Sequence, residues 1–260
     1  MRIRLLPLVT LGLFVLVLAD RVAAWRDQRN APERRAVQGA TDTRSPVPDP
    51  QAAGEDVMVE RAAAELAGGA GSLERLTREI DGTYLDSLIL STDSVVRRWP
   101  DRWGSPLRVH LVAGGAPGYT PRMAEFAREA FDRWEQTGVG VRFQMVSDSS
   151  DADVLVRWID RFDFDRAGQT DLTWDQLGRV RRATISLALH TQNGTPLPEA
   201  ALFAVAVHEA GHAIGLPHSA DTSDVMYPAT RTGTLTDRDR RTVKVLYRLP
   251  PGPVSEFAGR

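Results

Sequence analysis

The stretch HEAGHAIGLPH, from His208 to His218, constrains this chain more than any other part, because it holds three of the five histidines. His208 and His212 are four residues apart, so on a helix their side chains share one face and can bind the same ion. Gly215 can adopt the left-handed conformation that ends a helix, and Pro217 prevents the helix from resuming. His218 can then swing back toward the first two histidines. We therefore expect a helix, a sharp turn and one metal site.

Glu209 stands beside the first histidine and is expected to point toward the same metal. The spacing is the HExxH arrangement, in which two imidazoles bind zinc and the carboxylate accepts a proton from the zinc-bound water. A third imidazole leaves the fourth tetrahedral position of zinc to water, which separates a catalytic site from a structural one. The sequence therefore predicts one catalytic Zn²⁺ held by His208, His212 and His218, with Glu209 as general base. The alternative is three histidines that are merely packed or solvated.

Composition narrows the classes of protein that this chain can represent. It has 260 residues, of which 42% are hydrophobic and 25% charged, and this is enough for a globular core. The formal net charge of -2 gives no basis for nucleic-acid binding, which needs a concentrated basic surface. The chain contains no cysteine. It can form neither disulfides nor thiolate metal sites, so any metal must be held by His, Asp or Glu.

Residues 1–25 have the pattern of an export signal. Two arginines precede an apolar run from Leu5 to Ala19, and Val17 and Ala19 offer small residues for cleavage. The run is shorter than the roughly 20 residues that a membrane-spanning helix needs. An uncleaved anchor that extends to Trp25 is the alternative. We expect a secreted or extracytoplasmic protein of the periplasm or cell envelope, with membrane attachment through this segment left open.

The rest of the chain divides into a tether and one globular domain. Residues 26–55 are rich in Arg, Asp, Gln, Pro and Ala without apolar periodicity, whereas Leu73, Leu76 and Ile80 follow at helical spacing. We interpret residues 26–82 as a partly disordered tether, with a pro-segment as the alternative. The globular, catalytic domain is expected at 83–250, followed by a disordered tail at 251–260.

Apolar periodicity alternates between strand and helix spacing from residue 107 onward. Residues 107–112 alternate between apolar and polar, whereas residues 121–135 carry their apolar residues on one helical face. The same criteria predict strands at 107–112, 141–146, 152–158 and 182–189, and helices at 121–137, 198–214 and 237–247. Thr236 and Asp239 have the capping-box spacing of a helix start. This order of elements predicts a mixed α/β or α+β domain.

The motif and its surroundings resemble the metzincin metallopeptidases, whose signature HExxHxxGxxH is followed by a methionine turn. Within that group the chain is similar to the matrixins. Ser219 directly follows the third histidine, DVMYP at 224–228 supplies Met226 as the turn methionine, and LTDRDRRTVKVLY is similar to the closing helix of matrixins. The resemblance spans roughly residues 100 to 248.

The resemblance implies an α+β (mixed α/β) fold. Its twisted, mainly parallel sheet would have an antiparallel edge strand and pack on two helices, with a zinc cleft and a C-terminal helix. It also implies that a protein or peptide substrate lies extended against the edge strand, for which residues 182–189 are the candidate, with an ordinary buried strand as the alternative. Gly215 would make the turn and Met226 would lie beneath the metal as an apolar floor. Residues 161–175 are expected to form an exposed loop, with a Ca²⁺ site as the alternative.

Three features depart from the family pattern. Matrixin pro-segments block zinc with a cysteine, and this chain has none. His110 and His190 are too few for the second, structural zinc that many animal matrixins hold. The closing helix keeps Asp239 of a characteristic pair of aspartates but has Arg238 in the other place. The way in which this helix anchors the site is therefore expected to differ.

These observations predict an exported zinc-dependent endopeptidase that hydrolyses peptide bonds through a zinc-bound water activated by Glu209. Two alternatives stay open: a non-catalytic, zinc-containing envelope protein, and a metalloamidase that acts on cell-wall peptide. The expected partners are protein or peptide substrates and no nucleic acid, and we expect a monomer.

Overall fold

The computed structural model describes residues 75–89, 94–102 and 104–254. The expected export signal, most of the expected tether and residues 255–260 lie outside the described residues. Within them the fold is a mixed α/β arrangement with a mainly parallel five-stranded sheet, which confirms the expected fold class. In this part of the chain, no helix combines the length and the apolar character that a membrane span requires.

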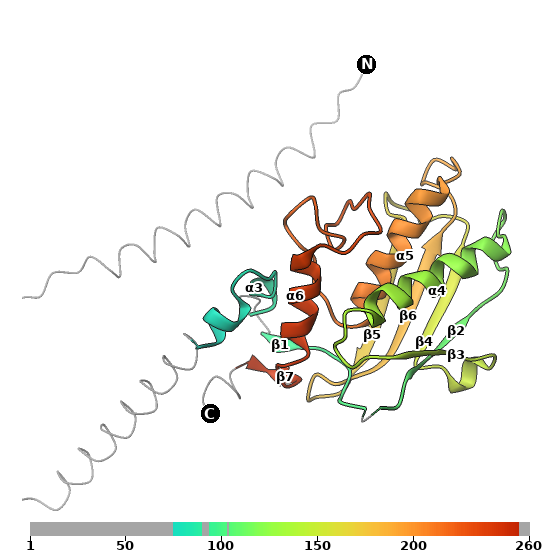
Figure 1. The fold of residues 1–260 in the computed structure, drawn as a ribbon. Helices are drawn as coiled ribbons and strands as arrows, with labels where there is room; N and C mark the ends of the chain where they lie inside the picture. Colours follow the sequence, from blue (N-terminus) through green and yellow to red (C-terminus); the bar gives the residue numbers. More distant parts are fainter. Residues whose placement is uncertain (1–74, 90–93, 103, 255–260) are drawn as a thin grey trace, which may run out of the picture. The chain divides into compact units, whose positions relative to one another are not determined.

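The central sheet has the strand order β3-β2-β4-β6-β5 (Figure 1). Its strands are β2 Leu107–Leu111, β3 Phe143–Met145, β4 Val154–Ile159, β5 Gly168–Trp174 and β6 Val180–Ala188. β2 pairs in parallel with β3 and with β4, and β4 pairs in parallel with β6. β5 runs antiparallel to β6. Val154, Val156 and Trp158 are buried, because alternate residues of β4 face the same side of the sheet.

The antiparallel edge strand is β5, so the expectation that residues 182–189 form this edge is wrong. Most of these residues belong to β6, which lies between β4 and β5 and is paired on both sides. The expectation of an exposed loop at 161–175 is also wrong for Gly168–Trp174, which form β5. An edge strand is paired on one side only, and β5 is not buried on both faces. Its sequence GQTDLTW therefore lacks the apolar pattern of an inner strand.

Helices α4 Pro121–Glu135 and α5 Glu199–Ala213 lie side by side against one face of the sheet (Figure 1). α4 buries the apolar face that its 3.6-residue period predicts, including Phe131 and Trp134. The indole nitrogen of Trp134 donates a hydrogen bond to the carbonyl oxygen of Val207 in α5 at 2.8 Å. α5 buries residues on almost every side, as expected for a helix inside a core. The helix that carries the histidine motif is thus held firmly by its neighbours.

The C-terminal helix α6 Asp237–Leu246 begins with the expected capping box. The Thr236 hydroxyl accepts a hydrogen bond from the backbone N–H of Asp239 at 3.0 Å. In return, the Asp239 carboxylate accepts from the backbone N–H of Thr236 at 2.9 Å. Two free N–H groups at the start of the helix are satisfied in this way.

Residues upstream of 83 pack into the same core. Residues 75–80 are helical, and Leu76 and Ile80 are buried in one hydrophobic cluster with Val243 and Leu246 of α6. The remaining elements are α3 Asp86–Ile89, β1 Val95–Val96, the 3-10 turn η1 Ser149–Asp151 and β7 Gly252–Pro253. β1 and β7 form an antiparallel pair, so the expectation of a disordered tail at 251–260 is wrong for Gly252–Pro253.

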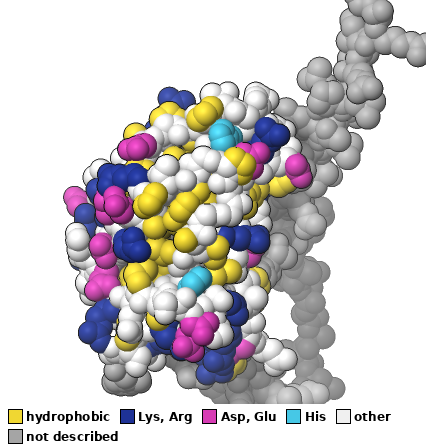
Figure 2. All heavy atoms as spheres, turned by 90° about the vertical axis from the view of Figure 1, so that its right-hand side faces the viewer, with side chains coloured by type: hydrophobic (Ala, Val, Ile, Leu, Met, Phe, Trp, Pro, Cys, Tyr) yellow, Lys and Arg dark blue, Asp and Glu magenta, His cyan; other side chains and the backbone are white. Residues whose placement is uncertain are grey.

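Charges of both signs are mixed on the face of the protein that Figure 2 shows. Acidic and basic side chains surround a central group of hydrophobic side chains there, without a continuous area of one sign. The mixture agrees with the near balance of 32 basic and 34 acidic residues in the chain.

Candidate metal centre

Helix α5 carries His208, Glu209 and His212 in its last two turns. The chain leaves the helix at Gly215, whose φ of +99° is a conformation that L side chains rarely adopt. A Cβ atom at this position would lie 2.3 Å from the carbonyl oxygen of Arg97. Glycine is therefore required twice, for its backbone angle and for the close approach of another segment. The turn brings His218 back toward the helix.

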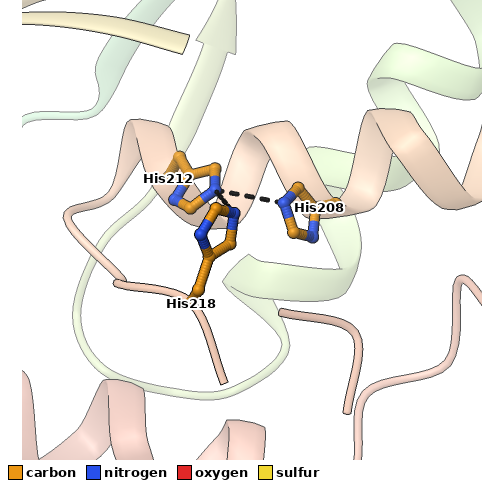
Figure 3. A group of neighbouring side chains, drawn as sticks. All are labelled: His208, His212 and His218. Carbon is orange, nitrogen blue, oxygen red and sulfur yellow. Dashed lines mark hydrogen bonds between the residues drawn. The ribbon is translucent and has the colours of Figure 1, made fainter. Parts of the chain in front are cut away.

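The three imidazoles converge on one point (Figure 3). Nε2 of His212 lies 3.1 Å from Nε2 of His208 and 3.1 Å from Nε2 of His218. His208 is buried, His212 is half-buried and His218 is exposed, so the group opens to solvent on the side of the third ring. Among the described residues, no other set of three His, Asp or Glu side chains has its ligand atoms so close together.

Backbone carbonyl groups set the tautomers of the first two rings. Nδ1 of His208 lies 2.8 Å from the carbonyl oxygen of Val225, and Nδ1 of His212 lies 2.8 Å from that of Leu216. Because a carbonyl oxygen can only accept, both Nδ1 atoms carry the proton and donate. Both Nε2 atoms then present lone pairs to each other, an arrangement that a shared cation satisfies.

This geometry fits zinc. With Zn–N bonds of about 2.0–2.1 Å in a tetrahedral site, ligand nitrogens are about 3.3 Å apart, close to the 3.1 Å between Nε2 of His212 and each of the other two Nε2 atoms. Burial lowers the pKa of His212 to about 3, and burial also lowers the pKa of His208. Both rings are therefore neutral near pH 7 and can donate a lone pair to a metal without first losing a proton.

Glu209 is buried next to the histidines and is held by the edge strand. The Thr170 hydroxyl of β5 donates to Oε2 of Glu209 at 2.6 Å. Burial raises the pKa of Glu209 to about 7, against the opposing effect of this hydrogen bond. Gly168 of the same strand leaves room for the carboxylate, since a Cβ atom there would lie 2.4 Å from Oε1.

Met226 is fully buried against the helix that carries the histidines. A Cβ atom on Gly211 would lie 2.4 Å from the sulfur of Met226, so the methionine touches α5 one residue before His212. The carbonyl oxygen of Met226 accepts from the backbone N–H of Ser219 at 2.9 Å. The methionine thus packs beneath the histidine motif, and its backbone bonds the residue after the third histidine.

The closing helix fixes the segment that orients His208. The Asp239 carboxylate, which is fully buried, accepts from the backbone N–H of Val225 at 3.0 Å and from the Tyr84 hydroxyl at 3.0 Å. Val225 in turn accepts from Nδ1 of His208. The hydrogen bonds run from Tyr84 through Asp239 and Val225 to His208, a support that holds the ring in its orientation.

Arg238 has a role of its own in this structure. Its Nε donates to Asp224 at 2.7 Å, and its Nη2 donates to the Ser219 hydroxyl at 2.7 Å. The Ser219 hydroxyl also donates to Asp224 at 2.5 Å. Arg238 therefore ties α6 to the segment between His218 and Met226, a contact that an aspartate in its place would not make with Asp224.

Two of the supporting residues were not expected from the sequence. Thr170 lies in the segment expected to be a loop, and Tyr84 lies upstream of the region that resembles matrixins. The signal that points to Thr170 is the antiparallel edge strand that the resemblance requires. His110 and His190 are not part of the group: Nδ1 of His110 contacts the carbonyl oxygen of Val146 at 3.2 Å, and Nδ1 of His190 lies 2.9 Å from Asp160.

Comparison with known protein families supports the resemblance. The sequence model of the matrixin family of peptidases matches residues 119–248, half of the 260-residue chain. The match begins just before α4 and ends just after α6, and it includes the histidine motif, β5 and the turn at Met226. The chain therefore belongs to the matrixin family of zinc metallopeptidases.

Proposed function

We propose that the protein is an exported zinc-dependent endopeptidase. His208, His212 and His218 would hold the zinc, and Glu209 would act as general base. The observation that carries the proposal is the convergence of three Nε2 atoms beside the buried carboxylate of Glu209, which is on the same helix as the first two histidines. When bound, zinc supplies a lowered pKa for water and polarisation of the scissile carbonyl.

The residues of the chain supply the proton transfers and the positioning. Glu209 accepts the proton of the attacking water and later delivers it to the leaving amine. The carbonyl oxygens of Val225 and Leu216 keep the first two imidazoles turned with Nε2 toward the metal. Met226 provides an apolar floor and not a ligand.

The substrate would bind along β5. One side of this strand pairs with β6, and among the described residues no strand pairs with its other side. An extended peptide can add its backbone to such an edge. Glu209 lies against the inner face of β5. A peptide on that edge therefore runs past the base.

Export and domain organisation complete the proposal. The N-terminal pattern of two arginines and an apolar run supports export, with cleavage after Ala19 or retention as an anchor. Residues 26–82 would link this segment to the catalytic domain, although the packing of Leu76 and Ile80 extends that domain upstream. N-terminal sequencing of the mature protein tests whether the signal is cleaved and whether residues 26–82 are removed, because it identifies the first residue of the mature chain.

The Glu209→Gln variant tests the catalytic assignment. We expect it to bind zinc as the wild type does and to lose cleavage of unfolded casein, because glutamine cannot accept the proton. Glu199→Gln, at the exposed start of the same helix, is the matched control and should keep full activity. Undiminished cleavage by the Glu209 variant would reject the proposal.

The same assays separate the alternatives. A wild-type protein that binds zinc but cleaves nothing would be a non-catalytic envelope protein. Turnover of purified cell-wall peptide, without cleavage of casein, would instead identify a metalloamidase. Chelator-sensitive cleavage of casein supports the endopeptidase. A Ca²⁺ site stays an alternative and the monomeric state stays a prediction, and both can be tested on these preparations.

A further inference from the structure

We infer that Thr170, on the edge strand β5, is a positioning residue that holds the Glu209 carboxylate in its reactive orientation. The inference rests on the proposed function, because it assigns a role in the proton transfers of Glu209. Thr170 is far from Glu209 in the sequence and reaches it only through the packing of β5 against α5.

The contact is short and specific. The Thr170 hydroxyl lies 2.6 Å from Oε2 of Glu209, the length of a strong hydrogen bond to a charged acceptor. Among the described residues, this hydroxyl is the one hydrogen-bond donor to the carboxylate. A buried carboxylate with a single donor depends strongly on that donor for its orientation.

Gly168, two residues earlier on the same strand, lies against the other oxygen of the carboxyl group. An added Cβ atom would lie 2.4 Å from Oε1 and 2.6 Å from Cγ of Glu209, and 2.7 Å from Cγ1 of Val205. The Glu209 side chain therefore lies directly against the backbone of β5 at this glycine. The strand limits the movement of the carboxylate by contact at Gly168 and by a hydrogen bond at Thr170.

The hydroxyl has a second acceptor within reach. The carbonyl oxygen of Glu209 lies 3.1 Å from the same Thr170 oxygen, whereas a hydroxyl group has only one proton. While Glu209 is a carboxylate, the hydroxyl donates to Oε2. When Glu209 carries the proton taken from water, the hydroxyl can turn its own proton to the carbonyl oxygen and accept from the carboxyl group. One side chain can thus hold Glu209 before and after proton transfer.

Position on β5 links this support to substrate binding. Thr170 is in the middle of the strand whose free edge would receive the peptide. Its side chain points inward to Glu209, while its backbone belongs to the edge. A peptide that orders β5 would therefore also order the hydroxyl that holds the base.

Three threonine variants test the inference. Thr170→Val keeps the shape and removes the hydroxyl, whereas Thr170→Ser keeps the hydroxyl. The matched control is Thr184→Val on β6: Thr170 pairs with Ile185, so Thr184 is on the opposite face of the sheet. We expect Thr170→Val to lower kcat about 10- to 100-fold with little change in KM, and the other two variants to stay near wild type.

Two further measurements do not depend on activity. Zinc affinity, measured by competition with a chromophoric chelator, should be unchanged in all three variants. Crystal structures of the zinc-loaded variants should show the Glu209 carboxylate turned or in several orientations in Thr170→Val, and unchanged in Thr170→Ser.

The outcomes separate the two proposals. A wild-type protein without peptidase activity would overturn the proposed function, and the orientation of Glu209 in the two Thr170 structures would still decide the role of the hydroxyl. An active wild type with an undiminished Thr170→Val variant would overturn the positioning role alone. Equal losses in Thr170→Val and Thr170→Ser would also overturn it, because the hydroxyl that Thr170→Ser keeps would then not be sufficient to hold the base.

Discussion

Replacement of Gly215 by alanine tests whether the turn after α5 delivers the third histidine. The variant adds one methyl group at a position where the backbone φ is +99°. The new carbon atom would lie 2.3 Å from the carbonyl oxygen of Arg97. That oxygen belongs to the backbone, so it cannot turn away as a side chain can. Either the turn or the segment around Arg97 must move.

The expected decrease in the free energy of unfolding has two parts. An L side chain in a left-handed conformation costs about 1–2 kcal/mol. The methyl group must also move from 2.3 Å to at least 3.0 Å from the oxygen, a shift of 0.7 Å by difference. Overpacking of this kind costs about 1–3 kcal/mol. The sum of about 2–5 kcal/mol is smaller than or comparable to a typical free energy of unfolding of about 5–15 kcal/mol, so we expect a folded protein with a displaced His218.

Gly138→Ala is the matched control for the Gly215 variant. Gly138 has a φ of +73°, and a Cβ atom there would have nothing within 4 Å. It should therefore lose only the conformational part, about 1–2 kcal/mol, and keep its zinc affinity. Urea unfolding of the zinc-free proteins measures the stabilities, and chelator competition measures zinc binding. For Gly215→Ala we expect zinc affinity to fall by about 10- to 100-fold.

The comparison can refute the reasoning in two ways. If both alanine variants lose the same free energy of unfolding, the contact with Arg97 does not restrict the turn. If Gly215→Ala is destabilised but binds zinc as tightly as the wild type, then the turn does not position His218. The entropy effect of replacing glycine in the unfolded chain is shared by both variants and cancels in the comparison.

Three more predictions follow from the same contacts. Tyr84→Phe removes the hydroxyl that donates to the buried Asp239, and it should lower the free energy of unfolding in urea by about 1–2 kcal/mol; an unchanged value would show that this hydrogen bond does not stabilise the fold. Gly168→Ala should reduce kcat more than about tenfold at normal zinc content, because the new methyl group displaces Glu209; normal turnover would contradict the close contact. Zinc at about 100 times its Kd should stabilise the fold by about 2.7 kcal/mol over chelator-treated protein, seen as a higher melting temperature, and equal melting temperatures would argue against a native metal site.

The sequence by itself determined the helix of the histidine motif, its end and the closing helix. Each of these depends on local features: a ligand spacing of four, a glycine followed by a proline, and a capping box at Thr236 and Asp239. Such signals act within one or two turns of chain, so they can be recognised without the rest of the protein. The family resemblance added the mainly parallel sheet and its antiparallel edge strand. The catalytic role of Glu209 stays a prediction.

Only the tertiary structure decided which strand forms the edge and which side chains support the site. Residues 182–189 have the clearer strand pattern, because β6 is an inner strand and most of its later residues are buried. The polar β5 can be recognised as the edge strand only from its place in the sheet. Thr170 meets Glu209, and Tyr84 meets Asp239, across 39 and 155 positions of sequence. Contacts over such separations follow from the packing of whole helices and strands, which no local period of the chain records.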